Sequence, residues 1–287
     1  MEKTISFLIQ SADHKGIIAR VSGYFYELGF NILSCQQFTD TQQDAYFMRI
    51  SLDGSDLPFS RAELEERFAA EADTMGLSWS VDYHDRPKNV ALLVTKASHC
   101  LFDLLERQHE GKLRCHIPLI IGNHPTLEYV ANQFKIPFYC VPVEEDKRAH
   151  EGEILSLLKK HYVDLVVLAR YMRILSPEFI AEYPHRIINI HHAMLPAFKG
   201  ANPYRRAYER GVKMIGATAH YATDDLDEGP IIEQDVMRVS HASMPKQLAR
   251  LGEDVERKVL STAVKYHLEH RVIVHGIRTV VFPESNE

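Results

Sequence analysis

Apolar and polar residues in the first part of the chain follow two alternating patterns, one typical of strands and one typical of helices. A period of two predicts strands, and apolar residues three or four apart predict helices. The predicted strands are Thr4–Gln10, Asn31–Thr39, Ala45–Leu52 and Leu77–Tyr83, and the predicted helices are Gly16–Leu28 and Ser60–Met75. Ser60 and Glu63 provide a capping box at the start of the second helix. The order βαββαβ predicts a small ferredoxin-like sandwich.

A different pattern begins after residues 84–88, a polar segment that contains Pro87. Short continuous apolar runs then alternate with helical stretches. These runs are Val90–Val94, Ile117–Ile121, Phe138–Val141, Leu165–Leu168 and Ile187–Ile190, with predicted helices at 101–110, 127–134, 151–161 and 177–183 between them. Continuous apolar strands joined by helices predict a doubly wound, mostly parallel, Rossmann-like sheet that is buried on both faces. Strands over Ile215–Tyr221 and Ile231–Val239 and a long helix near 245–269 complete the pattern.

Length, charge and cysteine usage narrow the classes of protein that fit this pattern. The 287 residues suffice for two α/β domains, and the polar segment places them at 1–84 and 89–287. The net charge of -6 provides no basic field for nucleic acid or an anionic membrane. The four cysteines lie in or next to apolar runs without a CxxC pair, which is typical of reduced thiols. Because no secretory leader and no apolar run of about 18 residues is present, we expect a cytoplasmic protein.

Three polar residues stand where the predicted fold would place a ligand site. Asn189 and His191 lie at the carboxyl end of a predicted strand, and Asp227 follows in the turn Asp227-Glu228-Gly229-Pro230. Ligands of doubly wound sheets bind beyond these strand ends. An amide can donate to a carbonyl oxygen on which charge develops, an imidazole can add a donor or pass a proton, and a carboxylate can orient water. This set suits acyl transfer or acyl hydrolysis without a covalent intermediate.

Simpler interpretations of these residues stay open at this point. A histidine at a strand end is commonly structural, and an Asp-Glu-Gly-Pro segment alone is a turn. His191 and His192, with His220 and Asp227, also invite a metal site. Adjacent residues of a strand point to opposite faces, however, and no HxxxH or HxxE spacing supports such a site, so we expect no metal. A Ser–His–Asp hydrolase is disfavoured because no G-x-S-x-G turn is present.

Longer blocks around these residues resemble the formyltetrahydrofolate-dependent transformylases and hydrolases. The blocks are residues 189–200 (NIHHAMLPAFKG), 216–221 (GATAHY), 226–232 (LDEGPII) and, upstream, 169–177 (ARYMRILSP). They occur in the order of the family and span nearly all of the second domain. The resemblance implies that Asn189, His191 and Asp227 form the catalytic centre. It also implies a pterin pocket whose lining includes Met172, Arg173, Ile174, Leu175, His220 and Tyr221.

Other features favour the hydrolases of this family over its transformylases. The turn after the first strand of the second domain, Val94–Leu101, contains no glycine, so the backbone cradle for a nucleotide phosphate is missing. The acidic balance opposes tRNA binding, and the segment after Pro230 is short for an RNA-binding domain or a fused dehydrogenase. The pair His191-His192, where the transformylases usually show His-Pro, is a further match.

The resemblance therefore implies hydrolysis of 10-formyltetrahydrofolate to tetrahydrofolate and formate, which supplies formate and balances the one-carbon folate pool for purine synthesis. Folate is then the substrate, and no further cofactor is expected. Asn189 and His191 would stabilise the oxyanion, and Asp227 would position or deprotonate water and keep His191 charged. Three residues close in sequence could exclude an amine, and the sequence does not rank them: His192, Lys199 and Tyr204.

Two other functions stay open on the sequence. A transformylase that acts on an amino-sugar or amino-acid amine would use the same three catalytic residues and lose little formyl to water. A folate- or amino-acid-binding regulatory protein without catalysis is the second alternative, although the complete set of three polar residues disfavours it. A formate-release assay without an acceptor separates these functions.

The first domain resembles an ACT domain, which extends the match to the hydrolases. Residues 11–21 (SADHKGIIARV) match its first turn and helix, and 47–49 (FMR) match its third strand. ACT domains commonly bind amino acids between copies, so the resemblance implies an effector site at Asp13, Gly16 and Asn31. It equally allows a domain that only holds a homo-oligomer together.

Overall fold

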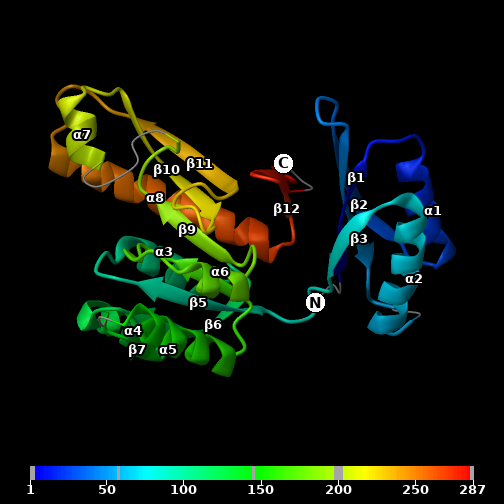
Figure 1. Cartoon of the computed structure of the whole chain (residues 1–287), viewed down its shortest axis with the longest axis horizontal. Helices are drawn as coiled ribbons and strands as arrows, with labels where there is room; N and C mark the ends of the chain where they lie inside the picture. The colour runs from blue at the N-terminus through cyan, green and yellow to red at the C-terminus, as the bar shows by residue number, and fades with distance from the viewer. Residues whose placement is uncertain (1–3, 57–58, 144–145, 197–202, 285–287) are drawn as a thin grey trace. The chain divides into compact units, whose positions relative to one another are not determined.

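A computed structural model describes the chain except for residues 1–3, 57–58, 144–145, 197–202 and 285–287 (Figure 1). Its contacts divide the chain into two compact units. The first unit contains residues 1–86, 269–275 and 280–287, and the second contains residues 87–268 and 276–279. The first boundary falls inside the predicted linker. The predicted second domain, 89–287, differs from the structure at its end, because most of the last residues belong to the first unit.

The first unit is built on a four-stranded antiparallel sheet. Its strands are β1 (Thr4–Ala12), β2 (Ile32–Asp40), β3 (Ala45–Asp53) and β4 (Ser78–Asp82), in the order β2-β3-β1-β4. Helices α1 (Ile17–Glu27) and α2 (Arg61–Met75) lie on the same side of this sheet (Figure 1). The capping box between Ser60 and Glu63 is present at the start of α2. The predicted ferredoxin-like arrangement is therefore confirmed.

Apolar side chains cover both faces of the first sheet. Phe7 and Ile9, which alternate along β1, belong to the core that includes residues of α1 and α2. Leu8 faces the other way and packs with Phe47, Ile273 and Phe282 in a second buried cluster. The last two come from the C-terminal segment, which carries strands β12 (Val272–His275) and β13 (Arg278–Val281). This packing explains why the end of the chain belongs to the first unit.

The second unit contains a seven-stranded sheet in the order β11-β10-β9-β8-β5-β6-β7. Its strands are β5 (Lys88–Val94), β6 (Cys115–Gly122), β7 (Phe138–Cys140), β8 (Leu165–Leu168), β9 (Ile187–His191), β10 (Met214–Tyr221) and β11 (Ile231–Arg238). The five strands from β5 to β9 are parallel, and β10 and β11 join antiparallel at one edge. The predicted mostly parallel sheet is therefore confirmed.

The helices of the second unit connect its strands and cover the sheet. They are α3 (His99–His109), the 3-10 turn η1 (Pro125–Leu127), α4 (Glu128–Gln133), α5 (Lys147–Lys160), α6 (Pro177–Glu182), α7 (Pro203–Glu209) and α8 (Pro245–Leu268). Residues of α5 and α6, such as Ile154 and Phe179, share a buried cluster with Leu93 of β5. Helix α8 packs against β9, β10, β11 and α3. None of the described helices is both long enough and apolar enough to cross a lipid bilayer.

The topology brings four segments to one end of this sheet. Strands β8 and β9 run in parallel, so the segments that follow them begin at the same edge. Strand β10 pairs antiparallel with β9 and places His220 directly opposite Asn189. The loop between β10 and β11 then carries Asp227. Residues far apart in the sequence are thus positioned for a common site.

Candidate active site

Asn189 and His191 line a cavity of about 850 Å³ together with Asp227. The two β9 residues are two positions apart, so their side chains point to the same face of the sheet. Cavities of this size bind small organic ligands. The cavity also receives residues of the loop after β8 and of helix α7. The structure therefore brings together the three predicted catalytic residues.

Asp227 forms a partly buried polar contact with His191. Its Oδ2 lies 3.1 Å from His191 Nδ1, and its Oδ1 lies 3.7 Å from His220 Nε2. Burial alone raises the pKa of the Asp227 carboxyl, but the interaction with His191 outweighs it and holds this pKa well below its usual range. Asp227 is consequently an ionised carboxylate and a weak base at neutral pH. It can orient His191 and water, but it is poorly suited to deprotonate water.

The turn that carries Asp227 depends on a close backbone approach. Asp227 adopts a left-handed conformation with φ 58°, and Tyr221 N donates to Pro230 O at 2.9 Å to close the loop. At Gly229 a Cβ atom would lie 1.8 Å from the carbonyl oxygen of Tyr221. Only glycine fits there without moving the loop, so the Asp-Glu-Gly-Pro segment is more than a generic turn.

His220 orients the side chain of Asn189. Its Nδ1 lies 3.0 Å from the carbonyl oxygen of Tyr221, which can only accept, so Nδ1 carries the hydrogen. Its Nε2 then accepts from Asn189 Nδ2 at 3.2 Å. Within the described part of the chain, the second Nδ2–H of Asn189 meets no acceptor. His220 was predicted to contact substrate, and the structure adds this supporting role to its place in the cavity lining.

His191 carries a buried nitrogen without a partner. Its Nδ1 is used by Asp227, while Nε2 is buried and finds no hydrogen-bond partner among the described residues. Buried polar atoms without partners are uncommon in folded proteins and often mark functional sites. This Nε2 and the second N–H of Asn189, both without a partner among the residues that the structure describes, belong to side chains that line the same cavity.

The predicted pterin loop, Met172–Leu175, also lines this cavity. Met172 and Ile174 are exposed, and their apolar side chains offer a surface for a flat ring. The loop is held at both ends: Met172 N donates to Thr95 Oγ1 at 2.9 Å, and Ser176 N donates to Glu151 at 2.9 Å. A fixed loop with exposed apolar side chains fits the predicted binding role.

Tyr221 occupies a different position from the other predicted substrate residues. Its side chain is buried and does not line the cavity. The phenol OH is bonded to His267 of α8 at 2.8 Å, and burial raises its pKa above the usual range. Its backbone still closes the Asp227 loop. The side chain of Tyr221 therefore contributes packing between β10 and α8.

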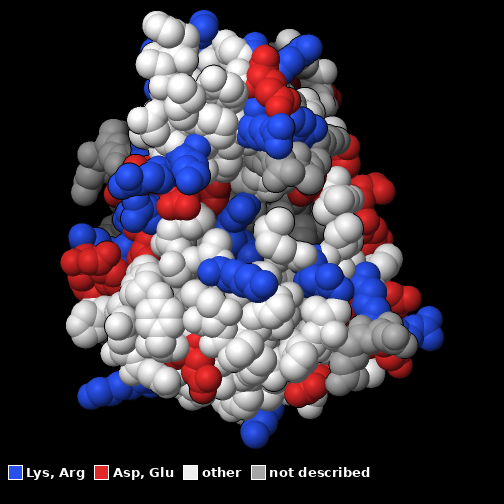
Figure 2. Space-filling view, turned by 90° about the vertical axis from the view of Figure 1, so that its left-hand side faces the viewer, with Lys and Arg blue, Asp and Glu red and all other residues white. Residues whose placement is uncertain are grey.

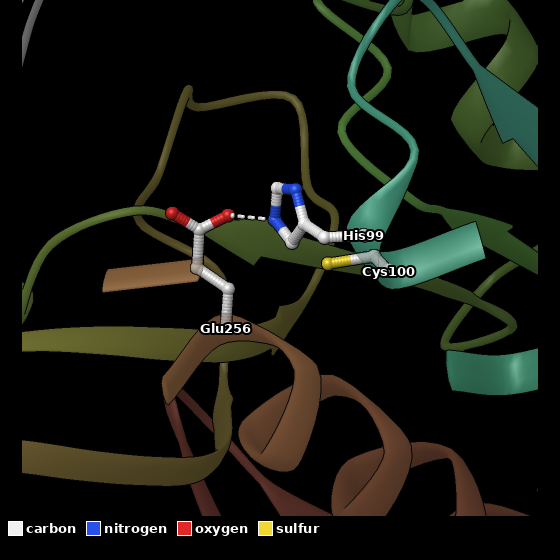
Figure 3. A group of neighbouring side chains, drawn as sticks. All are labelled: His99, Cys100 and Glu256. Atoms are coloured by element: carbon white, nitrogen blue, oxygen red, sulfur yellow. Dashed lines mark hydrogen bonds and ion pairs between the residues drawn. The ribbon is translucent and has the colours of Figure 1, made fainter. Parts of the chain in front are cut away.

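One additional group of potential metal ligands exists among the described residues. His99, Cys100 and Glu256 place their ligand atoms within 4.8 Å of one another, and Figure 3 shows them converging. Glu256 is already paired with His99 Nε2 at 2.7 Å, with the Tyr204 hydroxyl at 2.7 Å and with Arg170 Nε at 3.4 Å. Burial raises the pKa of the Cys100 thiol, which keeps it protonated. The group is a hydrogen-bonded network with its own cation, a poor fit for a metal.

Sequence reasoning did not find Glu256 or Arg170. Glu256 lies on α8, far from the site in the sequence, and no motif distinguishes it from the other charged residues of that helix. Arg170 lies in the ARYMRILSP block and adopts a left-handed conformation with φ 62°, which is unusual for a non-glycine residue. Lys199, one of the unranked candidates to exclude an amine, lies outside the described residues.

Basic side chains occur on the side of the molecule that faces the viewer in Figure 2. They cross the middle of this face in separate groups, with acidic side chains between and beside them, and the surface below is mostly uncharged with a few acidic and basic side chains. Such a mixed surface differs from the continuous basic field that nucleic-acid binding requires.

The proposed effector residues of the first unit lie at two ends of its sheet. Asp13 and Gly16 follow the end of β1, where Gly16 has φ 94° before α1. Asn31 precedes β2, and its carbonyl accepts from Asp53 N, which is opposite Thr4 at the start of β1. The nine residues of β1 separate these ends by about 25–30 Å. One copy of the unit therefore does not gather all three residues.

Comparison with known proteins agrees with this division of the chain. A family model described as formyl transferase matches residues 88–264, and one described as ACT domain matches residues 5–67. A relative from Synechocystis sp. named formyltetrahydrofolate deformylase is 48% identical over 280 residues, which cover 97% of this chain and 98% of that protein.

Solved structures show the same relationship. A formyltetrahydrofolate deformylase from Pseudomonas syringae pv. tomato superposes with a TM-score of 0.95 at 42% identity, covering 99% of this chain and 95% of that chain. Glycinamide ribonucleotide transformylase 1 from Symbiobacterium toebii superposes with a TM-score of 0.66 at 28% identity, covering 70% of this chain and 97% of that chain.

Proposed function

Since this chain belongs to the formyl transferase family and carries an ACT domain, we propose that it hydrolyses 10-formyltetrahydrofolate to tetrahydrofolate and formate. The observation that supports this most strongly is the pair of oriented groups in the cavity. His220 holds Asn189, and Asp227 holds His191, so each catalytic side chain keeps one polar atom available for a substrate. Full-length similarity to proteins named formyltetrahydrofolate deformylase supports the same reaction.

In the proposed mechanism the pterin binds against the loop Met172–Leu175 and directs its N10-formyl group toward Asn189 and His191. Water attacks the formyl carbon, and the carbonyl oxygen becomes an oxyanion. The amide N–H of Asn189 and Nε2–H of His191 stabilise this charge. One proton of the attacking water passes to N10 as the carbon–nitrogen bond breaks. The resulting formic acid loses the other proton to solvent, which leaves formate and tetrahydrofolate.

Asp227 has a positioning role in this mechanism. Because its pKa is held low, the carboxylate stays charged and keeps the paired His191 ring in one orientation. The mechanism uses the ring with a hydrogen on both nitrogens, since Nδ1 faces Asp227 and Nε2 must donate to the oxyanion. The mechanism uses side chains and water and calls for no cofactor.

A formate-release assay tests this function. The full chain is incubated with 10-formyltetrahydrofolate alone and, in parallel, with a primary amine. Formate without an acceptor is the expected result. Formylation of the amine with little formate in its absence would instead support a transformylase, the function suggested by the superposition with the Symbiobacterium toebii enzyme.

We also propose that the ACT unit binds an amino acid between two copies of the chain. Asp13 and Gly16 of one copy and Asn31 of another would then complete a site that one copy leaves divided. This model predicts a homo-oligomer. Each common amino acid added in turn to the formate-release assay, together with sedimentation of the chain, tests it.

A further inference from the structure

A buried carboxylate next to the cavity organises residues from four elements. Glu256 of α8 is 1% exposed, and its partners are His99 of α3, Tyr204 of α7 and Arg170 after β8. Burial alone raises the pKa of the Glu256 carboxyl, but these partners outweigh it and lower the pKa, so the group is ionised. Figure 3 shows Glu256 facing His99. The carboxylate thus has a fixed set of partners.

Tyr204 is held in place by a second contact. At Gly252, one helical turn before Glu256, a Cβ atom would lie 2.0 Å from the Tyr204 hydroxyl oxygen. The tyrosine side chain therefore occupies the space that any other residue at position 252 would fill. Glycine inside a helix costs about 1 kcal/mol relative to alanine, and the close approach of Tyr204 accounts for its presence in α8.

The network reaches the catalytic residues through two ring contacts, one tilted and one stacked. The ring centroids of Tyr204 and His192 are 6.3 Å apart. The His192 ring stacks on the His191 ring, with 5.1 Å between their centroids. Arg170, His192 and Tyr204 all line the cavity that contains Asn189. Burial, Arg170 and His191 lower the pKa of His192 to about 4, so His192 is neutral at pH 7. These residues form a packed polar wall, whereas Met172, Ile174 and Leu226 supply the apolar lining.

We infer that Tyr204 is a specificity-determining residue that closes the nucleophile side of the formyl site, and that Gly252 and Glu256 are positioning residues for it. This inference rests on the proposed hydrolysis. On this inference Tyr204 and His192 limit the space beside the formyl carbon, so that water is accepted and a substituted amine is excluded. Without the Tyr204 ring, an amine attacks the formyl carbon and the bond from this carbon to N10 breaks. N10 takes up the proton that the amine loses, so the products are a formamide and tetrahydrofolate.

The test measures how the formyl group divides between water and glycinamide. The full-length chain and each variant are incubated with 10-formyltetrahydrofolate and excess glycinamide, and formate and N-formylglycinamide are quantified. Tyr204→Ala is expected to raise the formylglycinamide share about 10-fold or more over the wild type. Gly252→Ala, which displaces the ring without removing it, and Glu256→Gln, which removes its anchor, are expected to shift the share in the same direction.

Matched controls come from the same two helices. Tyr208→Ala removes an exposed tyrosine of α7, and Glu253→Gln removes an exposed charge of α8, so both should leave the product ratio at the wild-type value. The ratio is measured per turnover and does not depend on how much of a variant is folded. The KM for 10-formyltetrahydrofolate should change little in Tyr204→Ala.

The outcomes separate this inference from the proposed function. A wild type that releases no formate would overturn both. A wild type that releases formate, with the same product ratio in Tyr204→Ala, Gly252→Ala and Glu256→Gln, would overturn the inference and leave the hydrolysis standing. An equal shift in the control variants would also contradict it, because the effect would then not depend on the wall.

Discussion

At the scale of single residues, the site consists of two oriented pairs. Asn189 depends on His220 for its orientation, and His191 depends on Asp227. The resemblance to the family implied the roles of Asn189, His191 and Asp227, whereas the tautomer of His220 became evident only from its contact with the Tyr221 carbonyl. A strand pattern places side chains on faces, but it does not say which nitrogen of a ring meets which neighbour.

Asn189→Ala should lower kcat about 10²- to 10³-fold, because one preorganised oxyanion donor is lost. The KM for 10-formyltetrahydrofolate should change little, since this donor acts mainly in the transition state. His220→Ala should lower kcat by a smaller factor, because Asn189 remains but loses its orientation. Steady-state kinetics of both variants check this order, and a His220→Ala effect larger than that of Asn189→Ala would contradict it.

His192 should make the wild type less stable in mild acid. Its pKa is about 4 in the folded chain and roughly 6.5 when unfolded, so the unfolded chain binds a proton first as the pH falls. The free energy of unfolding therefore falls as the pH drops from 6.5 to 4. At pH 5 this loss amounts to about 2 kcal/mol relative to neutral pH. Urea unfolding at pH 7 and pH 5 measures this loss in the wild type and in His192→Gln. The free energy of unfolding should fall less in the variant. Equal losses would contradict the buried neutral ring.

At the scale of elements, segments with a clear apolar period could be predicted from the sequence. Short helices and boundaries that depend on a capping contact could not. The parallel strands of the second unit carry continuous apolar runs, and their positions in the sequence follow from that signal. Helix α7 has seven residues with several charges and gives no clear period. Helix α5 begins earlier than the predicted 151–161, because Asp146 caps it by accepting from Arg148 N at 2.9 Å.

The loop between β10 and β11 should not tolerate a side chain at position 229. In Gly229→Ala the new Cβ meets the Tyr221 carbonyl, so the loop must move and carry Asp227 with it. We expect a loss of about 1–3 kcal/mol in the free energy of unfolding and a fall in kcat. Gly152→Ala is the control: its Cβ would meet nothing within 4 Å, and alanine in helix α5 should stabilise by about 0.5–1 kcal/mol. Normal activity of Gly229→Ala would refute the close-approach argument.

At the scale of the whole molecule, the end of the chain belongs with its beginning. Arg49 of β3 donates to the carbonyl oxygens of His270 at 3.0 Å and Glu269 at 3.2 Å, and Gln36 donates to Pro283 at 2.9 Å. Contacts between residues more than 200 positions apart leave no local pattern in the sequence. The prediction of a continuous second domain therefore missed this return of the chain.

Phe282→Ala should destabilise the first unit selectively. Phe282 is buried against Leu8 and Phe47, and its loss leaves a cavity at a typical cost of about 3–5 kcal/mol. Hydrogen exchange should become faster for the amides of β1 and β3, while β8 and β9 keep their protection. Uniform acceleration in both units would show that the C-terminal packing is not specific to the first sheet.

The most direct test of the proposed catalytic site is the rate of formate release from 10-formyltetrahydrofolate by the wild type and by Asp227→Asn, without an acceptor. The wild type should release formate, and the variant should be slower by about 10² or more, because His191 loses its charged partner. A wild type without formate release, or a variant with near-normal turnover, would contradict the central claim that Asp227, His191 and Asn189 transfer the formyl group to water.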